Sequence, residues 1–136
     1  MADGANTPEF KQLADLLSQE RDLLLAFVFG SMAAGNPGRD SDVDVAVLAA
    51  RDLPEERRLQ LMQLISGFSG RPVDLIDLRT AGPLIGQQVL KHGLLLFVHE
   101  PADLGNLLSR IQTDAEDFLQ IRDRMIRERL DTWTRG

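Results

Sequence analysis

The sequence contains no cysteine and only two histidines, His92 and His99. Disulfide bonds and thiolate-bound metal ions are therefore excluded, and two histidines far from any cysteine do not suggest a structural zinc site. Basic runs are also missing, because 15 Lys and Arg residues stand against 21 Asp and Glu residues, for a net charge of −6. An acidic chain of this kind is poorly suited to gripping nucleic acid.

Long hydrophobic runs are absent as well. No apolar stretch approaches the roughly 20 residues that a membrane-spanning helix requires. The N-terminal residues have neither the basic nor the apolar region of a signal peptide, so a soluble cytoplasmic protein is expected. A hydrophobic content of 43% is ordinary for a folded protein. We expect one domain over residues 1–136, with a core at about 8–99 and an amphipathic C-terminal helix at about 102–133.

Short apolar runs alternate with helical stripes as far as His99. The runs predict strands over residues 23–29, 42–48, 73–78 and 94–98, and the stripes predict helices over residues 8–18, about 51–67 and 80–92. Gly67 and Gly70 are expected to close the second helix, and Thr80 is the N-cap candidate of the third. This alternation is typical of an α/β (α+β) domain.

After Pro101 the pattern changes. Apolar residues from Leu107 to Leu130 recur three or four positions apart, and the positions between them are heavily charged. The spacing predicts an amphipathic helix of about 25 residues. Two interpretations stay open: the helix packs on its own domain, or its apolar side is a surface for a partner.

The chemistry is concentrated between Phe29 and Val45. Gly30 and Ser31 follow an apolar strand and offer backbone N–H groups and a hydroxyl to a phosphate. Asp42 and Asp44 are two positions apart on the next strand, so they share a face at roughly 7 Å between Cα atoms, a spacing that suits a shared divalent cation. Each half alone is usually a plain turn or a solvated strand entry. Together they indicate phosphoryl or nucleotidyl transfer.

A third acid is expected on the strand over residues 73–78. Asp74 repeats the design of the preceding strand, with an acid near the entry and apolar residues behind it on the same face. If the two strands run parallel, Asp74 lies beside Asp42 and Asp44, whereas Asp77 faces the other way. Asp77 is then an exposed strand-end acid or a cap for the turn that follows, and His92 is a helix-end residue rather than a catalytic base.

Gly30-Ser31 followed by Ser41-Asp42-Val43-Asp44-Val45 resembles the G-S-x(n)-S-D-x-D-[LV] signature of the DNA polymerase β nucleotidyltransferase superfamily. The small size resembles its minimal branch, the MNT proteins, many of which are antitoxins encoded beside a HEPN-domain RNase toxin. The resemblance covers roughly residues 25–98. The family often has a basic residue before the second glycine of the loop, where this chain has Ala34, and Arg39 is the alternative phosphate contact.

The resemblance implies a short mixed sheet of about four strands flanked by helices. It also implies that ATP binds at Gly30 and Ser31, and that Asp42, Asp44 and Asp74 hold two Mg²⁺ ions. The implied reaction transfers AMP to a tyrosine hydroxyl of a HEPN toxin, which is thereby neutralised. Two alternatives remain: a small-molecule nucleotidyltransferase of the aminoglycoside-modifying type, which usually carries a further domain, and an antitoxin that acts by binding alone.

Overall fold

Four strands form one mixed sheet in the order β3-β2-β1-β4. In the computed structural model, which describes residues 8–29, 42–111, 119–125 and 127, these strands are β1 (Leu23–Phe29), β2 (Val43–Ala49), β3 (Val73–Asp77) and β4 (Leu94–Val98). Strand β1 runs antiparallel to β2 and β4, and β2 runs parallel to β3. The mixed sheet and the α+β class expected from the sequence are therefore confirmed.

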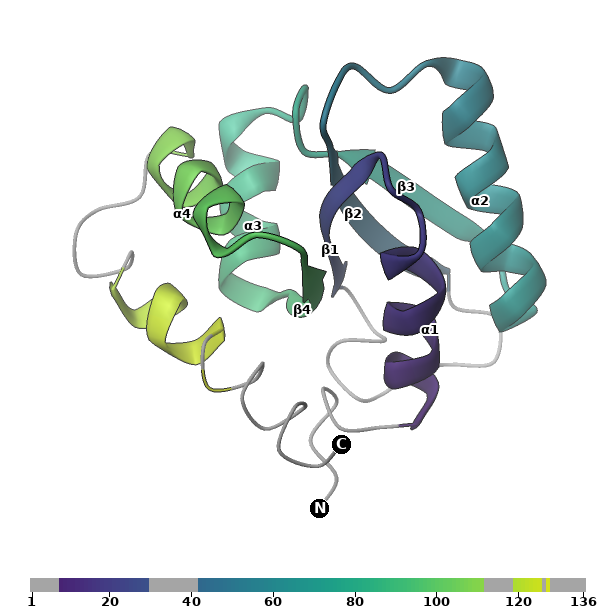
Figure 1. Cartoon of the computed structure of the whole chain (residues 1–136), viewed down its shortest axis with the longest axis horizontal. Coiled ribbons are helices and arrows are strands. Elements are labelled where there is room, and N and C mark those ends of the chain that lie inside the picture. Colours follow the sequence, from purple (N-terminus) through teal and green to yellow (C-terminus); the bar gives the residue numbers. More distant parts are fainter. Residues whose placement is uncertain (1–7, 30–41, 112–118, 126, 128–136) are drawn as a thin grey trace.

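Helices cover both faces of the sheet (Figure 1). Helices α1 (Pro8–Ser18) and α2 (Glu55–Ser69) lie on one face, and α3 (Pro83–His92) and α4 (Pro101–Arg110) lie on the other. Alternate residues of β2 serve the two layers. Val43, Val45 and Val47 belong to the core cluster of α1 and α2, while Ala46 and Leu48 belong to the cluster of α3 and α4. This alternation is the one predicted from the sequence.

The ends of two helices differ from the prediction. Helix α2 runs on through Gly67 and ends only at Gly70, whose φ of 71° is the left-handed conformation that glycine adopts readily. Helix α3 begins at Pro83 with Gly82 as its N-cap. Thr80 is not the cap, because its backbone N–H and its hydroxyl both donate to the carbonyl of Asp77. The residue therefore belongs to the turn that closes β3.

The prediction of one continuous helix over about 102–133 is wrong. Helix α4 ends at Arg110, and Ile111 is extended, with φ −84° and ψ 104°. Residues 119–125 and 127 are helical again, and we call them the C-terminal segment. Ile121 and Met125 of this segment are buried in the cluster that α3 and α4 share. A straight helix over residues 102–133 would span roughly 48 Å, about three times the length of the ten-residue α3.

No helix in the described ranges is long and apolar enough to cross a lipid bilayer.

Candidate active site at the edge of the sheet

Three strand ends meet at one edge of the sheet. Strands β2 and β3 both begin there, and their parallel register pairs Asp44 with Asp74. Strand β1 ends at the same edge, where Phe29 pairs with Asp44 on the other side. The hydrogen bond from the Val43 N–H to the Pro72 carbonyl, at 2.8 Å, ties the two strand entries together. The structure therefore places the second and third predicted acids side by side.

Asp44 and Asp74 also share a face. The residues that follow them at alternate positions, Ala46 and Ile76, both pack with the core cluster of α3 and α4. Asp42 precedes β2 two positions before Asp44 and is exposed, as is Asp74, whereas Asp44 is half-buried. The parity argument that selected Asp74 over Asp77 depended on a parallel pairing of the two strands, and that pairing is present.

The electrostatics of this edge centre on Asp44. Burial raises the pKa of its carboxyl above the ordinary value, and the nearby carboxylates of Asp74 and Asp42 raise this pKa further. Asp74 and Asp42 therefore disfavour the ionised form of Asp44. A bound cation would relieve this repulsion, since it interacts favourably with all of the carboxylates at once.

The described carboxylates do not form a complete protein cage for a metal ion. Within the described ranges, no three acidic, histidine or cysteine side chains converge closely enough to hold one ion between them. Mg²⁺ does not require such a cage, because proteins commonly bind it with one or two carboxylates and complete the coordination with substrate phosphate oxygens and water. The neighbouring pair Asp44 and Asp74, with Asp42 close by, suits that mode of binding.

Asp77, the other acid of β3, and the two histidines lie outside this cluster. Asp77 accepts a hydrogen bond of 3.0 Å from the Arg79 N–H, so it caps the turn as the sequence indicated. His92 is the last residue of α3, as predicted. The ring of His99 packs at 4.9 Å from that of Phe97, and its Nε2 lies 2.9 Å from the Ser18 carbonyl. Both histidines therefore have positions explained by the fold.

Four residues of the predicted phosphate loop, namely Gly30, Ser31, Ala34 and Arg39, lie outside the described residues. The sequence did not reveal the contribution of Pro72, whose carbonyl fixes the entry of β2. A proline at the start of a predicted strand was the available signal, but nothing in the spacing of residues showed which N–H its carbonyl would accept.

The part of the chain that contains all four strands is similar to known proteins. Residues 11–102 match the family described as "Polymerase beta, Nucleotidyltransferase". A curated relative, the protein adenylyltransferase MntA of Shewanella oneidensis, is 41% identical over 75 residues, which are 55% of this chain and 54% of that protein. The matched region therefore spans about half the length of that relative.

Solved structures extend the likeness over most of the chain. A chain in a crystal structure of a toxin–antitoxin with AMP-PNP superposes with a TM-score of 0.63 and 30% identity, covering 94% of this chain and 97% of that one. A chain in the complex of a tri-AMPylated HEPN toxin with an MNT antitoxin, also from Shewanella oneidensis, gives 0.58 and 27%, with 93% of both chains covered. The paired carboxylates at the sheet edge, the mixed sheet and the match over residues 11–102 lead to one conclusion: the chain belongs to the polymerase β nucleotidyltransferase family.

Proposed function

We propose that this chain is an antitoxin with protein adenylyltransferase activity, which transfers AMP from ATP to a tyrosine hydroxyl of a HEPN-domain RNase toxin. The observation that carries the proposal is the parallel pairing of Asp44 with Asp74 at the edge where Gly30 and Ser31 follow β1 in the sequence. The relatives support the choice of a HEPN toxin as the acceptor of AMP. One relative is a protein adenylyltransferase, and a similar solved structure contains an AMPylated HEPN toxin in complex with an MNT antitoxin.

The reaction is an in-line displacement at the α-phosphorus of ATP. The tyrosine oxygen forms a bond to this phosphorus, the bond from the phosphorus to the oxygen that bridges to the β-phosphate breaks, and pyrophosphate leaves. The hydroxyl proton passes to a carboxylate oxygen of Asp74, which is exposed and so accessible to the acceptor. Gly30 and Ser31 bind the β- and γ-phosphates through backbone N–H groups and the hydroxyl.

Asp42, Asp44 and Asp74 are the residues that would hold Mg²⁺. Two ions, when bound, would neutralise charge on the triphosphate and on the departing pyrophosphate. Their role here is supported by the electrostatics of Asp44, whose pKa is raised by burial and then by the carboxylates of Asp74 and Asp42. Removal of divalent cations with EDTA should therefore abolish transfer, and added Mg²⁺ should restore it.

The proposal is tested by incubating the chain with Mg²⁺, a HEPN-domain toxin and ATP labelled at the α- or the γ-phosphate. Label from the α-phosphate on the toxin, and none from the γ-phosphate, is the expected result. Toxin neutralised in a tight complex without label would show an antitoxin that acts by binding alone. Label on an aminoglycoside instead of the toxin would show a small-molecule nucleotidyltransferase, and either result would overturn the proposal.

A further inference from the structure

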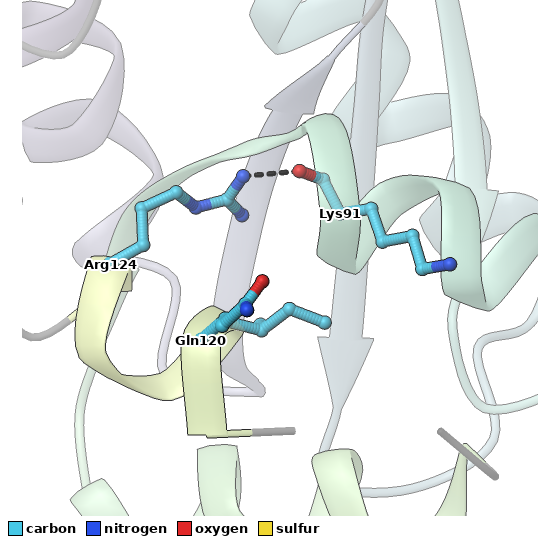
Figure 2. A pocket seen from close by; sticks show the side chains of 4 residues that line it. Lys91, Gln120 and Arg124 are labelled. Carbon is cyan, nitrogen blue, oxygen red and sulfur yellow. Dashed lines mark hydrogen bonds between the residues drawn. The ribbon is translucent and has the colours of Figure 1, made fainter. Parts of the chain in front are cut away.

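Arg124 of the C-terminal segment reaches the end of helix α3. Its guanidinium donates hydrogen bonds to the backbone carbonyls of Leu90, at 2.5 Å, of Gly93, at 3.2 Å, and of Lys91. Figure 2 shows the Arg124 side chain extending to the Lys91 carbonyl, while the Lys91 side chain points away. The carbonyls at a helix C-terminus have no partner within the helix and carry partial negative charge, so a guanidinium is well matched to them.

The contact stands beside a cavity of about 280 Å³ lined by Lys91, Gln120, Ile121 and Arg124. Ile121 and Met125 anchor the same segment, because both are buried in the core cluster of α3 and α4. The C-terminal segment is therefore held at two kinds of contact, an apolar one to the core and a polar one to the α3–β4 turn.

Gly93 forms that turn and lies directly against β1. A Cβ atom at this position would stand 3.4 Å from the Val28 carbonyl oxygen and 3.5 Å from the Phe27 Cβ, and only 2.5 Å from the Val89 carbonyl oxygen. The next residue, Leu94, pairs with Val28 in the sheet. Gly93 and Leu94 therefore connect the end of α3 to the last residues of β1.

The end of β1 is part of the candidate active site. Phe29 follows Val28, pairs with Asp44 and directly precedes Gly30 and Ser31. The contacts therefore run from Arg124 to Gly93, from there to the end of β1, and from Phe29 to its partner Asp44. The match to the family model ends at residue 102, so Arg124 lies outside the matched residues.

We propose that Arg124 is a positioning residue for nucleotide binding. By holding the α3–β4 turn against β1, it fixes the end of that strand beside Asp44 and at the start of the predicted phosphate turn. The C-terminal segment thereby supports the nucleotide site without contacting the nucleotide. This inference rests on the proposed function, since it assumes that ATP binds at this edge.

The test measures the affinity of the full-length chain for AMP-PNP with Mg²⁺ by calorimetry, for the wild type and for Arg124→Gln. We expect the dissociation constant to rise about 2- to 30-fold, the range for residues that act on a site through packed neighbours. Arg124→Lys should recover part of the affinity, because an ammonium can still donate to these carbonyls. Arg122→Gln is the matched control, since Arg122 is exposed in the same segment and pairs there with the carboxylate of Asp123, at 3.8 Å.

A stability-matched variant separates positioning from a general loss of structure. Leu17→Ala in α1 weakens the core on the opposite face of the sheet. If this variant, at an equal loss of thermal stability, weakens AMP-PNP binding as much as Arg124→Gln, the positioning role is wrong. Unchanged affinity in Arg124→Gln would also overturn the inference, and would leave the proposed function standing. Failure of the wild-type chain to bind AMP-PNP would overturn both.

Discussion

Asp44 is a residue whose charge opposes folding. Because its pKa is raised by burial and by Asp74 and Asp42, the folded state binds a proton at Asp44 more tightly than the unfolded state does. The ionised carboxylate therefore lowers stability at neutral pH, and the loss disappears as the pH falls through the raised pKa. This cost is of the kind that functional sites impose on their fold.

A thermal-denaturation series tests this account of Asp44. In the presence of EDTA, Asp44→Asn should raise the melting temperature at pH 7, and the gain should shrink towards pH 4 as the wild-type carboxyl becomes protonated. Asp15→Asn, an exposed acid on α1, is the control and should change the melting temperature little. A lower melting temperature for Asp44→Asn at pH 7 would show that the carboxylate stabilises the fold instead.

Arg57, in contrast to the ionised Asp44, forms an ion pair that stabilises the fold. Its Nε and Nη2 atoms bind the two carboxylate oxygens of Asp22 at 2.9 and 2.8 Å, and Nη2 also binds Glu20 at 2.8 Å. These contacts join α2 to the turn before β1. The hydrogen bonds from Arg57 are the main cause of a lowered pKa at Asp22, so this pair stabilises the fold above the ordinary pKa of aspartate.

We expect Arg57→Gln to reduce the free energy of unfolding by about 1 kcal/mol at pH 7, because the pair is bidentate but partly exposed. The difference should vanish as the pH falls through the lowered pKa of Asp22, where the carboxyl is protonated in the folded state too. Urea unfolding at pH 7 and at low pH measures both values. An equal loss at the two pH values would mean that Arg57 acts through packing alone.

At the scale of elements, α3 and the end of α4 approach closely at Gly86. A Cβ atom on Gly86 would lie 2.8 Å from Cδ1 of Ile111, which is too close without movement of that side chain. Gly86→Ala should therefore destabilise the fold by about 1–3 kcal/mol, despite the better helix propensity of alanine.

Ile111→Val removes the clashing methyl group and should offset part of this cost. The double variant is expected to be more stable than the sum of the two single changes predicts, by about 0.5–3 kcal/mol. Chemical denaturation of the four proteins gives this coupling energy. Strict additivity would show that α3 and Ile111 do not pack as described.

The C-terminal segment is an element whose role the sequence left open between core and partner surface. Its buried residues Ile121 and Met125 favour the core, although Leu119 is half exposed. A chain that ends after Ile111 should lose about 3–6 kcal/mol of stability, from the removal of these two apolar side chains. Leu119→Ala should cost less than about 0.5 kcal/mol, as for an ordinary surface change. A truncated chain of unchanged stability would show that the segment is not part of the core.

The sheet could be predicted from the sequence because the patterns that indicate strands involve only neighbouring residues. Alternation in β2 and the position of Asp74 in β3 follow from the two-residue period of a strand, and that period alone decides which acids share a face. The end of α4 was missed because no glycine or proline marks it. Helix α4 ends just before Ile111, and the Ile111 side chain packs against Gly86 of α3. This tertiary contact is not visible in the local sequence. The contacts of Arg124 were invisible for the same reason, because they join residues more than 30 positions apart.

At the scale of the whole molecule, the order β3-β2-β1-β4 explains why one edge of the sheet carries the chemistry. The antiparallel pairing of β1 with β2 brings the end of one strand beside the start of the next, and the parallel crossover through α2 returns β3 to the same edge. Acids near the entry of β2 and β3 must therefore meet close to the end of β1. Within the part of the chain that the structure describes, the helices pack on the two faces of the sheet, and the three carboxylates lie at this edge.

The comparison of Asp74→Asn with Asp77→Asn tests this arrangement most directly. Both changes remove one carboxylate from β3 at nearly constant volume, but Asp74 pairs with Asp44, whereas Asp77 caps the following turn. With α-labelled ATP, Mg²⁺ and a HEPN toxin, we expect Asp74→Asn to lower AMP transfer at least about 100-fold, as for loss of a general base. Asp77→Asn should stay within about threefold of the wild type, because the asparagine side-chain oxygen can still accept the Arg79 N–H. Equal rates in the two variants would contradict the site.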